Sequence, residues 1–503
     1  MIFPVLSVIV FTPVTAALII LMMPAEKKNL VRAIALSAAI LALSLSLWVY
    51  LSYDKNIAGY QFIEHYNWLP ALGINLYFGV DGMSAPLVLL TGVVMFTGVL
   101  ISWGDKSEHV SAGIQDRPRE FFAFLFLLAS GVFGVFVSLD LFMLFFFYEI
   151  AVFPMYLLIS IWGWIQTREY AAMKLTLYLF MGSVVSLVGA LAMYWAAGKS
   201  TGVYTFDMIQ LEKAGFSASF QNLWFLPVFF GFAVLGGIWP FHNWSPDGHV
   251  AAPTAVSMFH AGVLMKLGAF AALRVGIMLL PLGARHWSWV IMLCAAVAVV
   301  YGAFIAFVQT DFKYVIGFSS VSHMGLVMLG LSTLSREGLT GAGMQMFSHG
   351  VMTALFFAVV GMVYDRAHTR QISELGGMAK VMPWAAVGFI IGSLVSMGMP
   401  GFSGFIAEFP IFLGVWKTQW LVAVLASISI IITAAYVMLV VRRVFFGQMP
   451  EKFVGHITPI TLFDKVAIGT LCSLMIGIGL FPSLMVPLVG TGVKHILDLL
   501  GVH

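Results

Sequence analysis

Charged residues are scarce in this sequence: only 9% of its 503 residues are Asp, Glu, Lys or Arg. A soluble domain carries about 25% charged residues, so a cytosolic enzyme of several domains is excluded. The 25 basic and 22 acidic residues nearly cancel and leave a formal charge of +3. This balance excludes the strongly basic surface that nucleic-acid binding requires.

Cysteine is almost absent, since the chain holds only Cys294 and Cys472. They lie far apart in apolar stretches without a CxxC or CxxCH motif, which excludes a disulfide framework, an iron–sulfur site and covalent haem attachment. The sequence also lacks a P-loop and a Rossmann fingerprint. We therefore expect no cofactor on this chain and no energy source of its own.

Long apolar runs dominate what is present, because 61% of the residues are hydrophobic. A membrane-spanning helix needs about 20 such residues, and the amino-terminal run lacks a basic leader and a cleavage site, so we interpret it as a retained first helix. We predict an all-α polytopic membrane protein in which residues 1–503 form a single transmembrane domain of about 14 helices. The predicted spans are 3–23, 31–51, 83–102, 120–138, 140–162, 174–196, 223–241, 255–280, 287–308, 313–333, 340–363, 384–416 with a break, 420–441 and 465–487.

The segments between these spans are short. The longest, 52–82 and 197–222, are expected only to cap the helices, and the tail at 490–503 is expected to form a short interfacial helix.

Lys and Arg residues are distributed unequally between the two sides of this predicted bundle. With the amino terminus outside, the cytoplasmic loops hold Lys27, Lys28, Arg32, Lys106, Arg117, Arg119, Arg168, Lys174, Lys313, Arg366, Arg370, Lys380, Arg442, Arg443, Lys452 and Lys465. The opposite loops hold only Lys55, Lys199, Lys213, Arg285, Arg336, Lys417 and Lys494. Basic residues accumulate on the cytoplasmic side, so both termini are predicted to be periplasmic.

Two predicted helices contain breaks. The seventh is interrupted in GGIWPFHNWSPDGHVAAPT and the twelfth in SMGMPGFSGFIAEFP. Irregular backbone at membrane depth is tolerated only where protein or water satisfies it. Because the breaks are five helices apart, we predict two inverted repeats, at 119–283 and 287–447, of the kind that places ion sites at discontinuous helices.

Three charged residues lie inside predicted spans: Glu149, Lys266 and Glu408. Each costs at least a few kcal/mol near the bilayer centre, so we interpret them as parts of an ion path. The alternatives are a protonated structural carboxyl for Glu149, a snorkelling lysine for Lys266 and a helix-capping carboxylate for Glu408. Arg274, nearer a helix end, is expected to snorkel.

Histidines link these charges. His323 and His349 lie about equally far from the loop around Arg336, so a helical hairpin places them at similar depth, and His260 precedes Lys266 in the eighth span. Carboxylate, amine and imidazole groups all exchange protons, which favours a proton relay over isolated hydrogen-bonding histidines. A di-haem cytochrome with His323 and His349 as axial ligands is the competing interpretation from another class of protein.

Several long motifs carry a resemblance: FFFYEIAVFPMYLLI, AVSMFHAGVLMKLGAFAALR, QTDFKYVIGFSSVSHMGLVML, QMFSHGVMTALFF, HTRQISELGG and SMGMPGFSGFIAEF. Over nearly its whole length the chain resembles the antiporter-like membrane subunits of respiratory complex I (NADH:quinone oxidoreductase), most closely the subunit M or chain 4 type. The resemblance implies two inverted five-helix repeats within 14 helices and proton translocation driven by redox energy from partner subunits. It also implies a midplane axis made of Glu149, Lys266, His323, His349 and Glu408.

The same resemblance implies neighbouring membrane-arm subunits on both sides and a peripheral redox arm. Flavin and iron–sulfur clusters are expected in those partners, quinone is expected to bind only there, and the location is expected to be the bacterial inner membrane. A subunit of a multisubunit sodium/proton antiporter or of a membrane-bound hydrogenase, both of which use relatives of this fold, is the alternative. A purely structural scaffold between neighbours is a third.

One position departs from the family pattern. Leu235 stands where the family places a lysine that pairs with the glutamate corresponding to Glu149, and no Lys or Arg occurs from Ala214 to Pro246. Lys174 could reach the site, although a snorkelling role suits it better, or a water chain through Glu149 could suffice. Our hypothesis is a third account, a specialised subunit that pumps weakly or not at all.

Overall fold

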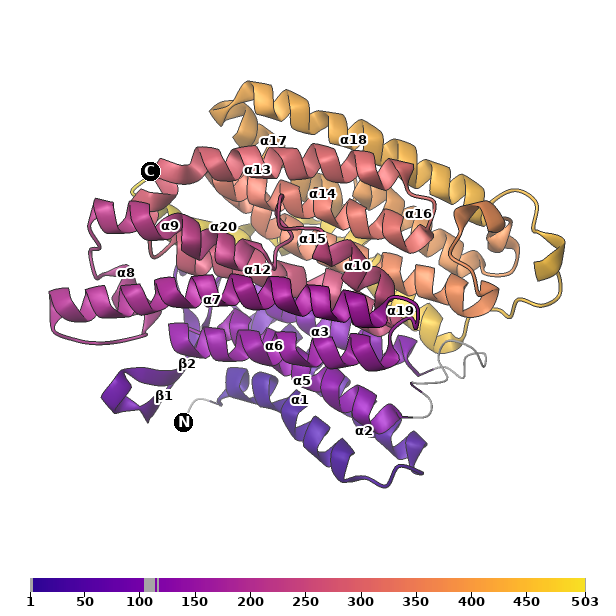
Figure 1. Cartoon of the computed structure of the whole chain (residues 1–503), viewed down its shortest axis with the longest axis horizontal. Helices are drawn as coiled ribbons and strands as arrows, with labels where there is room; N and C mark the ends of the chain where they lie inside the picture. Colours follow the sequence, from indigo (N-terminus) through magenta and orange to yellow (C-terminus); the bar gives the residue numbers. More distant parts are fainter. Residues whose placement is uncertain (1–2, 104–113, 115–116, 503) are drawn as a thin grey trace.

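The structure is a computed structural model that describes residues 3–103, 114 and 117–502; Lys106 lies outside this range. Within the described residues, 12 helices are long and apolar enough to cross a membrane. They run side by side in one bundle, with both termini at the same end (Figure 1). The predicted all-α membrane class is therefore confirmed.

The helices follow the predicted spans closely. The first half of the chain contains α1 (Val5–Met22), α2 (Lys28–Ser52), α3 (Ser84–Ile101), α5 (Pro118–Val137), α6 (Leu141–Trp162), α7 (Arg168–Thr201), α8 (Met208–Glu212), α9 (Ala218–Ala233), α10 (Trp244–Ala251) and α11 (Thr254–Phe259). The π-helical turn η2 (His260–Leu264) then leads into α12 (Met265–Ala271) and a second π-helical turn, η3 (Ala272–Ile277).

The second half contains α13 (Pro281–Val308), α14 (Phe312–Ser332), α15 (Arg336–Ala367), α16 (Pro383–Ser396), α17 (Ser403–Thr418), α18 (Trp420–Val440), α19 (Leu462–Leu480) and α20 (Val486–Leu500). The last of these is the helix expected in the tail. A π-helical turn, η6 (Val441–Phe445), continues α18.

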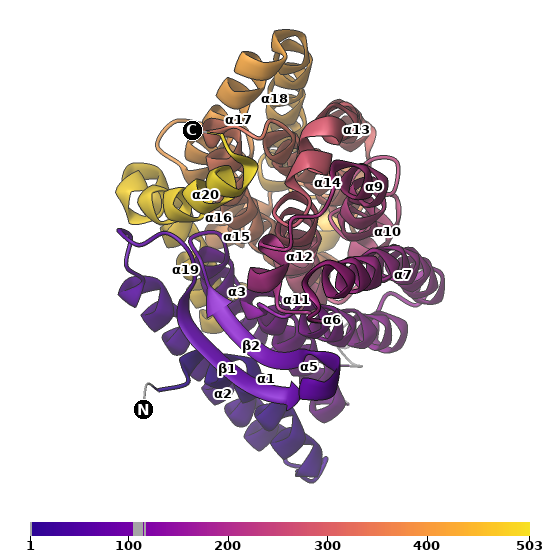
Figure 2. The same cartoon turned by 90° about the vertical axis from the view of Figure 1, so that its left-hand side faces the viewer.

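The segment at 52–82 does more than cap helices, because it folds into an antiparallel hairpin of β1 (Gln61–Leu69) and β2 (Ile74–Val80). Figure 2 shows this hairpin lying across one end of the bundle. Both strands are rich in aromatic and β-branched residues, which favours strands over helix. Glu64 of β1 accepts hydrogen bonds from the backbone amides of Leu6 (2.7 Å) and Ser7 (2.9 Å) and so caps α1.

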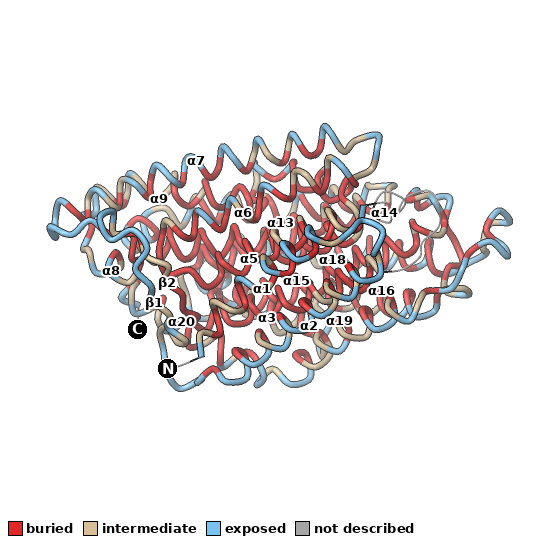
Figure 3. The backbone as a smooth tube through the Cα atoms, turned by 90° about the horizontal axis from the view of Figure 1, so that it is seen from below, coloured by how far each residue is buried: buried red, intermediate tan, exposed pale blue. Residues whose placement is uncertain are grey.

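Burial is concentrated in a few central helices (Figure 3). In the spans Thr254–Ile277 and Arg336–Ala367, all residues of the apolar 18-residue segment are buried. In α2 and α7, only 33% and 39% of the corresponding segment is buried. Lys266 and His349 lie in the fully buried spans. Their polar groups are therefore shielded from lipid by other helices of the same chain.

Both predicted helix breaks are present. The chain leaves α9 at Ala233 and resumes at Trp244 in α10, and it leaves α16 at Ser396 and resumes at Ser403 in α17. Gly237 (φ +73°) and Gly398 (φ +65°) adopt the left-handed conformation that interrupts each helix. The inverted-repeat relation between the two halves remains a prediction.

Candidate functional site

A single buried carboxylate, that of Glu408, lies beside the break between α16 and α17 and is contacted by polar side chains of two other helices. His323 Nδ1 of α14 lies 3.1 Å from Oε1 of Glu408 of α17, and Gln345 Nε2 of α15 donates to the same oxygen over 3.0 Å. Gly398 makes room for this carboxylate, because an added Cβ there would lie 2.9 Å from the other oxygen, Oε2. Glu408 is thus a hydrogen-bonded partner of His323 rather than a simple helix cap.

His323 and His349 lie at the same depth, as predicted, with their ring centroids 5.3 Å apart. The second nitrogen of His323, Nε2, lies 3.0 Å from the hydroxyl of Ser396. Both nitrogens of His323 are therefore engaged by protein groups, an arrangement that favours a hydrogen-bonded relay over axial ligation of haem iron. His349 has no hydrogen-bond partner for either ring nitrogen within the described structure.

Lys266 is 0% exposed in α12 and does not snorkel. It follows the π-helical turn η2, where the wider turn leaves backbone carbonyls accessible, and its ammonium donates to the carbonyl of Ala261. No carboxylate pairs with it among the residues that the structure describes. A buried amine held only by a carbonyl can exchange a proton without first breaking an ion pair.

His260 lies against a second buried histidine that sequence reasoning missed. The rings of His260 and His249, from the last turn of α10, are 3.9 Å apart, and Trp244 stacks on His260 at 5.2 Å. The hydroxyl of Ser245 lies 3.1 Å from Nε2 of His249. His249 follows the predicted helix break closely in sequence, and this position could have identified it as a candidate site residue.

Glu149 stands apart from this buried group. Its side chain is exposed on the outer face of α6, near Ser183 of α7. Among the described contacts, none is a hydrogen bond or ion pair to another predicted site residue. The structure therefore brings together His260, Lys266, His323, His349 and Glu408 and leaves Glu149 on the surface of the bundle.

Leu235 is fully buried where the chain leaves α9, packed against Gly268 of α12. Lys174 does not replace the missing cation, because its ammonium pairs with Asp247 of α10 at 2.7 Å. Asp247 also accepts a hydrogen bond from the hydroxyl of Tyr314 over 3.0 Å. Lys174 is therefore held by a carboxylate on the broken helix.

Arg274 does not snorkel either. It is 2% exposed, and its guanidinium pairs with Asp81, which is fully buried, at 2.8 Å. Burial alone would raise the pKa of Asp81, but the charge and hydrogen bond of Arg274 outweigh it and lower that pKa below its usual value. The hydroxyl of Tyr60 adds an acceptor at 3.1 Å. Snorkelling was expected because the sequence does not reveal Asp81, which is remote from Arg274, as its partner.

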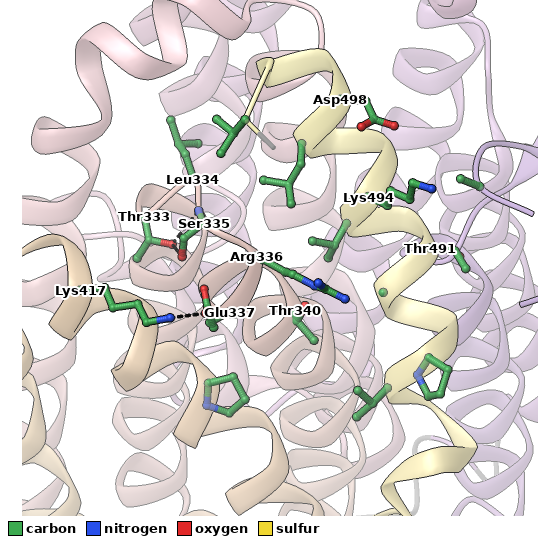
Figure 4. Close-up of a pocket in the computed structure, with 18 of the residues that line it drawn as sticks. Thr333, Leu334, Ser335, Arg336, Glu337, Thr340, Lys417, Thr491, Lys494 and Asp498 are labelled. Atoms are coloured by element: carbon green, nitrogen blue, oxygen red, sulfur yellow. Dashed lines mark hydrogen bonds and ion pairs between the residues drawn. The ribbon is translucent and has the colours of Figure 1, made fainter. Parts of the chain in front are cut away.

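A large groove opens at the end of the bundle where the termini lie. Figure 4 shows α15, α17 and α20 around it, and its volume is about 1510 Å³. Its charged lining includes Arg336, Lys494 and the ion pair between Lys417 and Glu337. None of the residues of the buried histidine, lysine and Glu408 cluster lines it.

Comparison with known proteins identifies relatives of this chain. Residues 138–433 match the family model described as NADH:quinone oxidoreductase/Mrp antiporter, TM. NADH-quinone oxidoreductase subunit M of Rhodobacter capsulatus is 36% identical over 98% of this chain and 96% of its own length. NAD(P)H-quinone oxidoreductase chain 4 2 of Microcystis aeruginosa is 36% identical over 94% of this chain and 85% of its own length.

Solved structures share the fold. A chain of respiratory complex I from Thermus thermophilus with bound NADH superposes with a TM-score of 0.88 at 26% identity, covering 99% of this chain and all of that one. A chain of the Mrp complex from Dietzia sp. DQ12-45-1b gives a TM-score of 0.86 at 20% identity, covering 99% of this chain and 98% of that one. At 20% identity the second likeness shows the fold alone.

Proposed function

Because the chain belongs to the NADH:quinone oxidoreductase/Mrp antiporter family of transmembrane subunits, we propose that it is an antiporter-like subunit, of the subunit M type, in the membrane arm of complex I. It translocates protons with redox energy released in partner subunits. The names of its relatives favour this role over a sodium/proton antiporter or a membrane-bound hydrogenase.

One observation carries the proton-transfer part of the proposal: a buried lysine, which no carboxylate pairs with in the described part of the chain, lies in the same core as a histidine pair and a buried glutamate. Lys266 and His349 are 0% and 1% exposed, and His323 contacts Glu408 at 3.1 Å. A proton leaves the Lys266 ammonium, crosses the imidazoles of His349 and His323, and reaches the Glu408 carboxylate. Every group on this route has an accessible second protonation state.

The relay has two further members. His260, whose ring contacts those of Trp244 and His249, precedes Ala261, whose carbonyl binds Lys266. Glu149 is the outer member, which the neighbouring subunit covers. Because Leu235 supplies no cation to pair with it, the connection from Glu149 to the buried axis is weak and this subunit pumps weakly.

The two halves of the chain, 119–283 and 287–447, form inverted repeats in this proposal. Each half contains one broken helix, α9–α10 or α16–α17, and each carries a buried titratable residue after its break, His249 in α10 and Glu408 in α17. Discontinuous helices in corresponding positions of two repeats are typical of ion-transport sites.

The chain resides in the bacterial inner membrane with both termini periplasmic, which is supported by its Lys and Arg distribution and by the two termini lying at one end of the bundle. Flavin and iron–sulfur clusters belong to partner subunits, and quinone binds there as well. Other membrane-arm subunits flank the chain on both sides.

Purification of the native assembly tests this function. The expected result is a complex that contains flavin and iron–sulfur centres and moves protons into sealed vesicles when it oxidises its electron donor. A sodium-dependent assembly without redox centres would overturn the complex I assignment and favour the antiporter alternative.

A further inference from the structure

Two buried cations hold the end of the half-helix α10. The ammonium of Lys313 donates to the carbonyl of Ala252 over 2.6 Å and to that of Val250 over 3.3 Å. The guanidinium of Arg370 donates to the carbonyl of Val250 over 3.0 Å. These carbonyls lie at the carboxyl end of a helix, where cations are stabilised.

Only one of the two cations has a carboxylate partner. Arg370 Nε lies 3.2 Å from Asp311, and its guanidinium stacks over Trp164 at 4.1 Å. Lys313 is 7% exposed and has no ion pair within 4.0 Å among the residues described here; Asp311 and Asp365 act on it only at longer range. Lys313 is thus held by carbonyls alone, as Lys266 is.

Lys313 lies at the start of its helix, beside the end of α10 whose carbonyls it binds. It is the second residue of α14, at the end of the bundle opposite the termini (Figure 1). The last turn of α10, whose carbonyls it binds, carries His249, and the His249 ring lies 3.9 Å from that of His260. His249 Nδ1 and both ring nitrogens of His260 have no hydrogen-bond partner in the described structure.

These groups form a series between α14 and α12. Lys313 binds carbonyls of the turn that follows His249, the His249 ring contacts that of His260, and His260 precedes Ala261, whose carbonyl binds the Lys266 ammonium. The series does not pass through Leu235 or Glu149. It therefore offers the axis a source of protons that the absence of the helix-break lysine leaves intact.

We propose that Lys313 is the residue through which protons enter the buried axis from the loop end opposite the termini. The Lys313 ammonium gives one proton to neutral His249, directly or along water, and becomes an amine. It then takes one proton from the aqueous phase and is again an ammonium, so charge and protons balance over a cycle. Arg370 keeps the Val250 carbonyl hydrogen-bonded while Lys313 is neutral. This inference rests on the proposed function.

Lys313→Arg provides the sharpest test, because arginine keeps the positive charge and the donors but does not deprotonate in proteins. The measurement is the number of protons translocated per electron by the purified complex in sealed vesicles, beside a Lys266→Met variant that interrupts the same axis. The matched control is Lys380→Arg, because Lys380 is an exposed lysine in the loop between α15 and α16.

The expected result is a Lys313→Arg ratio that falls to that of Lys266→Met, with the Lys380→Arg ratio equal to the native one. A Lys313→Arg ratio equal to the native one would overturn the entry role and leave the proposed function standing. A native complex that moves no protons would overturn both.

A second variant guards against misfolding, since the larger arginine could disturb a buried site. Lys313→Gln retains an N–H donor for the Ala252 carbonyl but cannot carry a proton. Loss of the ratio in Lys313→Gln, with unchanged assembly and unchanged electron transfer to a soluble artificial acceptor, supports entry at Lys313. A retained ratio in an assembled Lys313→Gln complex would show that the lysine only caps α10.

Discussion

His323 Nδ1 lies 3.1 Å from Glu408 Oε1, and this contact joins the buried imidazole of α14 to the helix break between α16 and α17. Gln345 shares the same carboxylate oxygen at 3.0 Å. The carboxylate is therefore positioned by two donors from separate helices. A change in the protonation of Glu408 therefore acts directly on His323. This contact couples Glu408, the last group of the axis, to the other groups.

Replacing Glu408 with glutamine tests this coupling. Glu408→Gln keeps the shape and an acceptor oxygen but removes the titratable group, so we expect fewer protons per electron with unchanged assembly. Glu451→Gln, an exposed position in a loop, is the control and should retain the native ratio. Equal ratios in both variants would remove Glu408 from the path.

Gly398 is predicted to be intolerant of a side chain. Gly398→Ala places a Cβ 2.9 Å from Glu408 Oε2 on a backbone with φ +65°, which costs about 1–2 kcal/mol and displaces the carboxylate. The thermal midpoint and the proton-to-electron ratio should both fall. Gly477→Ala, where an added Cβ meets nothing within 4 Å, should change neither. A native ratio in Gly398→Ala would show that the carboxylate position is not critical.

Leu235→Lys is predicted to raise the proton-to-electron ratio. The new ammonium would lie at the break after α9 and supply the cation whose absence weakens the connection between Glu149 and the buried axis. The comparison requires the native and variant complexes side by side in sealed vesicles. A native ratio that is already as high as that of the variant would contradict the hypothesis of weakened pumping.

The Asp81–Arg274 pair is predicted to stabilise the bundle. Arg274→Gln leaves the fully buried Asp81 carboxylate without a cation, a change that costs about 3–5 kcal/mol, so thermal unfolding should occur at a lower temperature. The double variant Asp81→Asn with Arg274→Gln should recover part of this loss. A single variant as stable as the native protein would contradict this role.

The same pair has a defined pH dependence. Because the pKa of Asp81 is lowered in the folded protein, its contribution to stability is present above the ordinary carboxyl pKa. That contribution is lost as the pH falls through the lowered value. Acid unfolding curves of the native protein and Asp81→Asn should therefore converge at low pH, and curves that stay parallel would contradict this dependence.

The sequence predicted the helices and both breaks, because apolar run length and the Gly and Pro residues are local signals. It also predicted that His323 and His349 lie level, since an antiparallel helical hairpin fixes their depth. It could not predict the hydrogen bond of Gln345 to Glu408 or the pairing of Arg274 with Asp81. These partners are remote in sequence and meet only through packing.

Two further features needed the structure for other reasons. The hairpin of β1 and β2 was missed because a short segment between long apolar runs, without a strict alternation of apolar and polar residues, gives a weak strand signal. Glu149 was expected beside the other charges, and only the packing of α6 against α7 shows that it faces outward. Helix periodicity alone does not say which face of a wholly apolar helix meets a neighbour.

The most direct test of the buried proton path is the proton-to-electron ratio of the purified complex with Lys266→Met, which retains the length of the side chain and removes its charge. The path predicts a lower ratio than that of the native complex, while assembly and electron transfer to a soluble artificial acceptor stay unchanged. An unchanged ratio would contradict the assignment of Lys266, His349, His323 and Glu408 as the route of the proton.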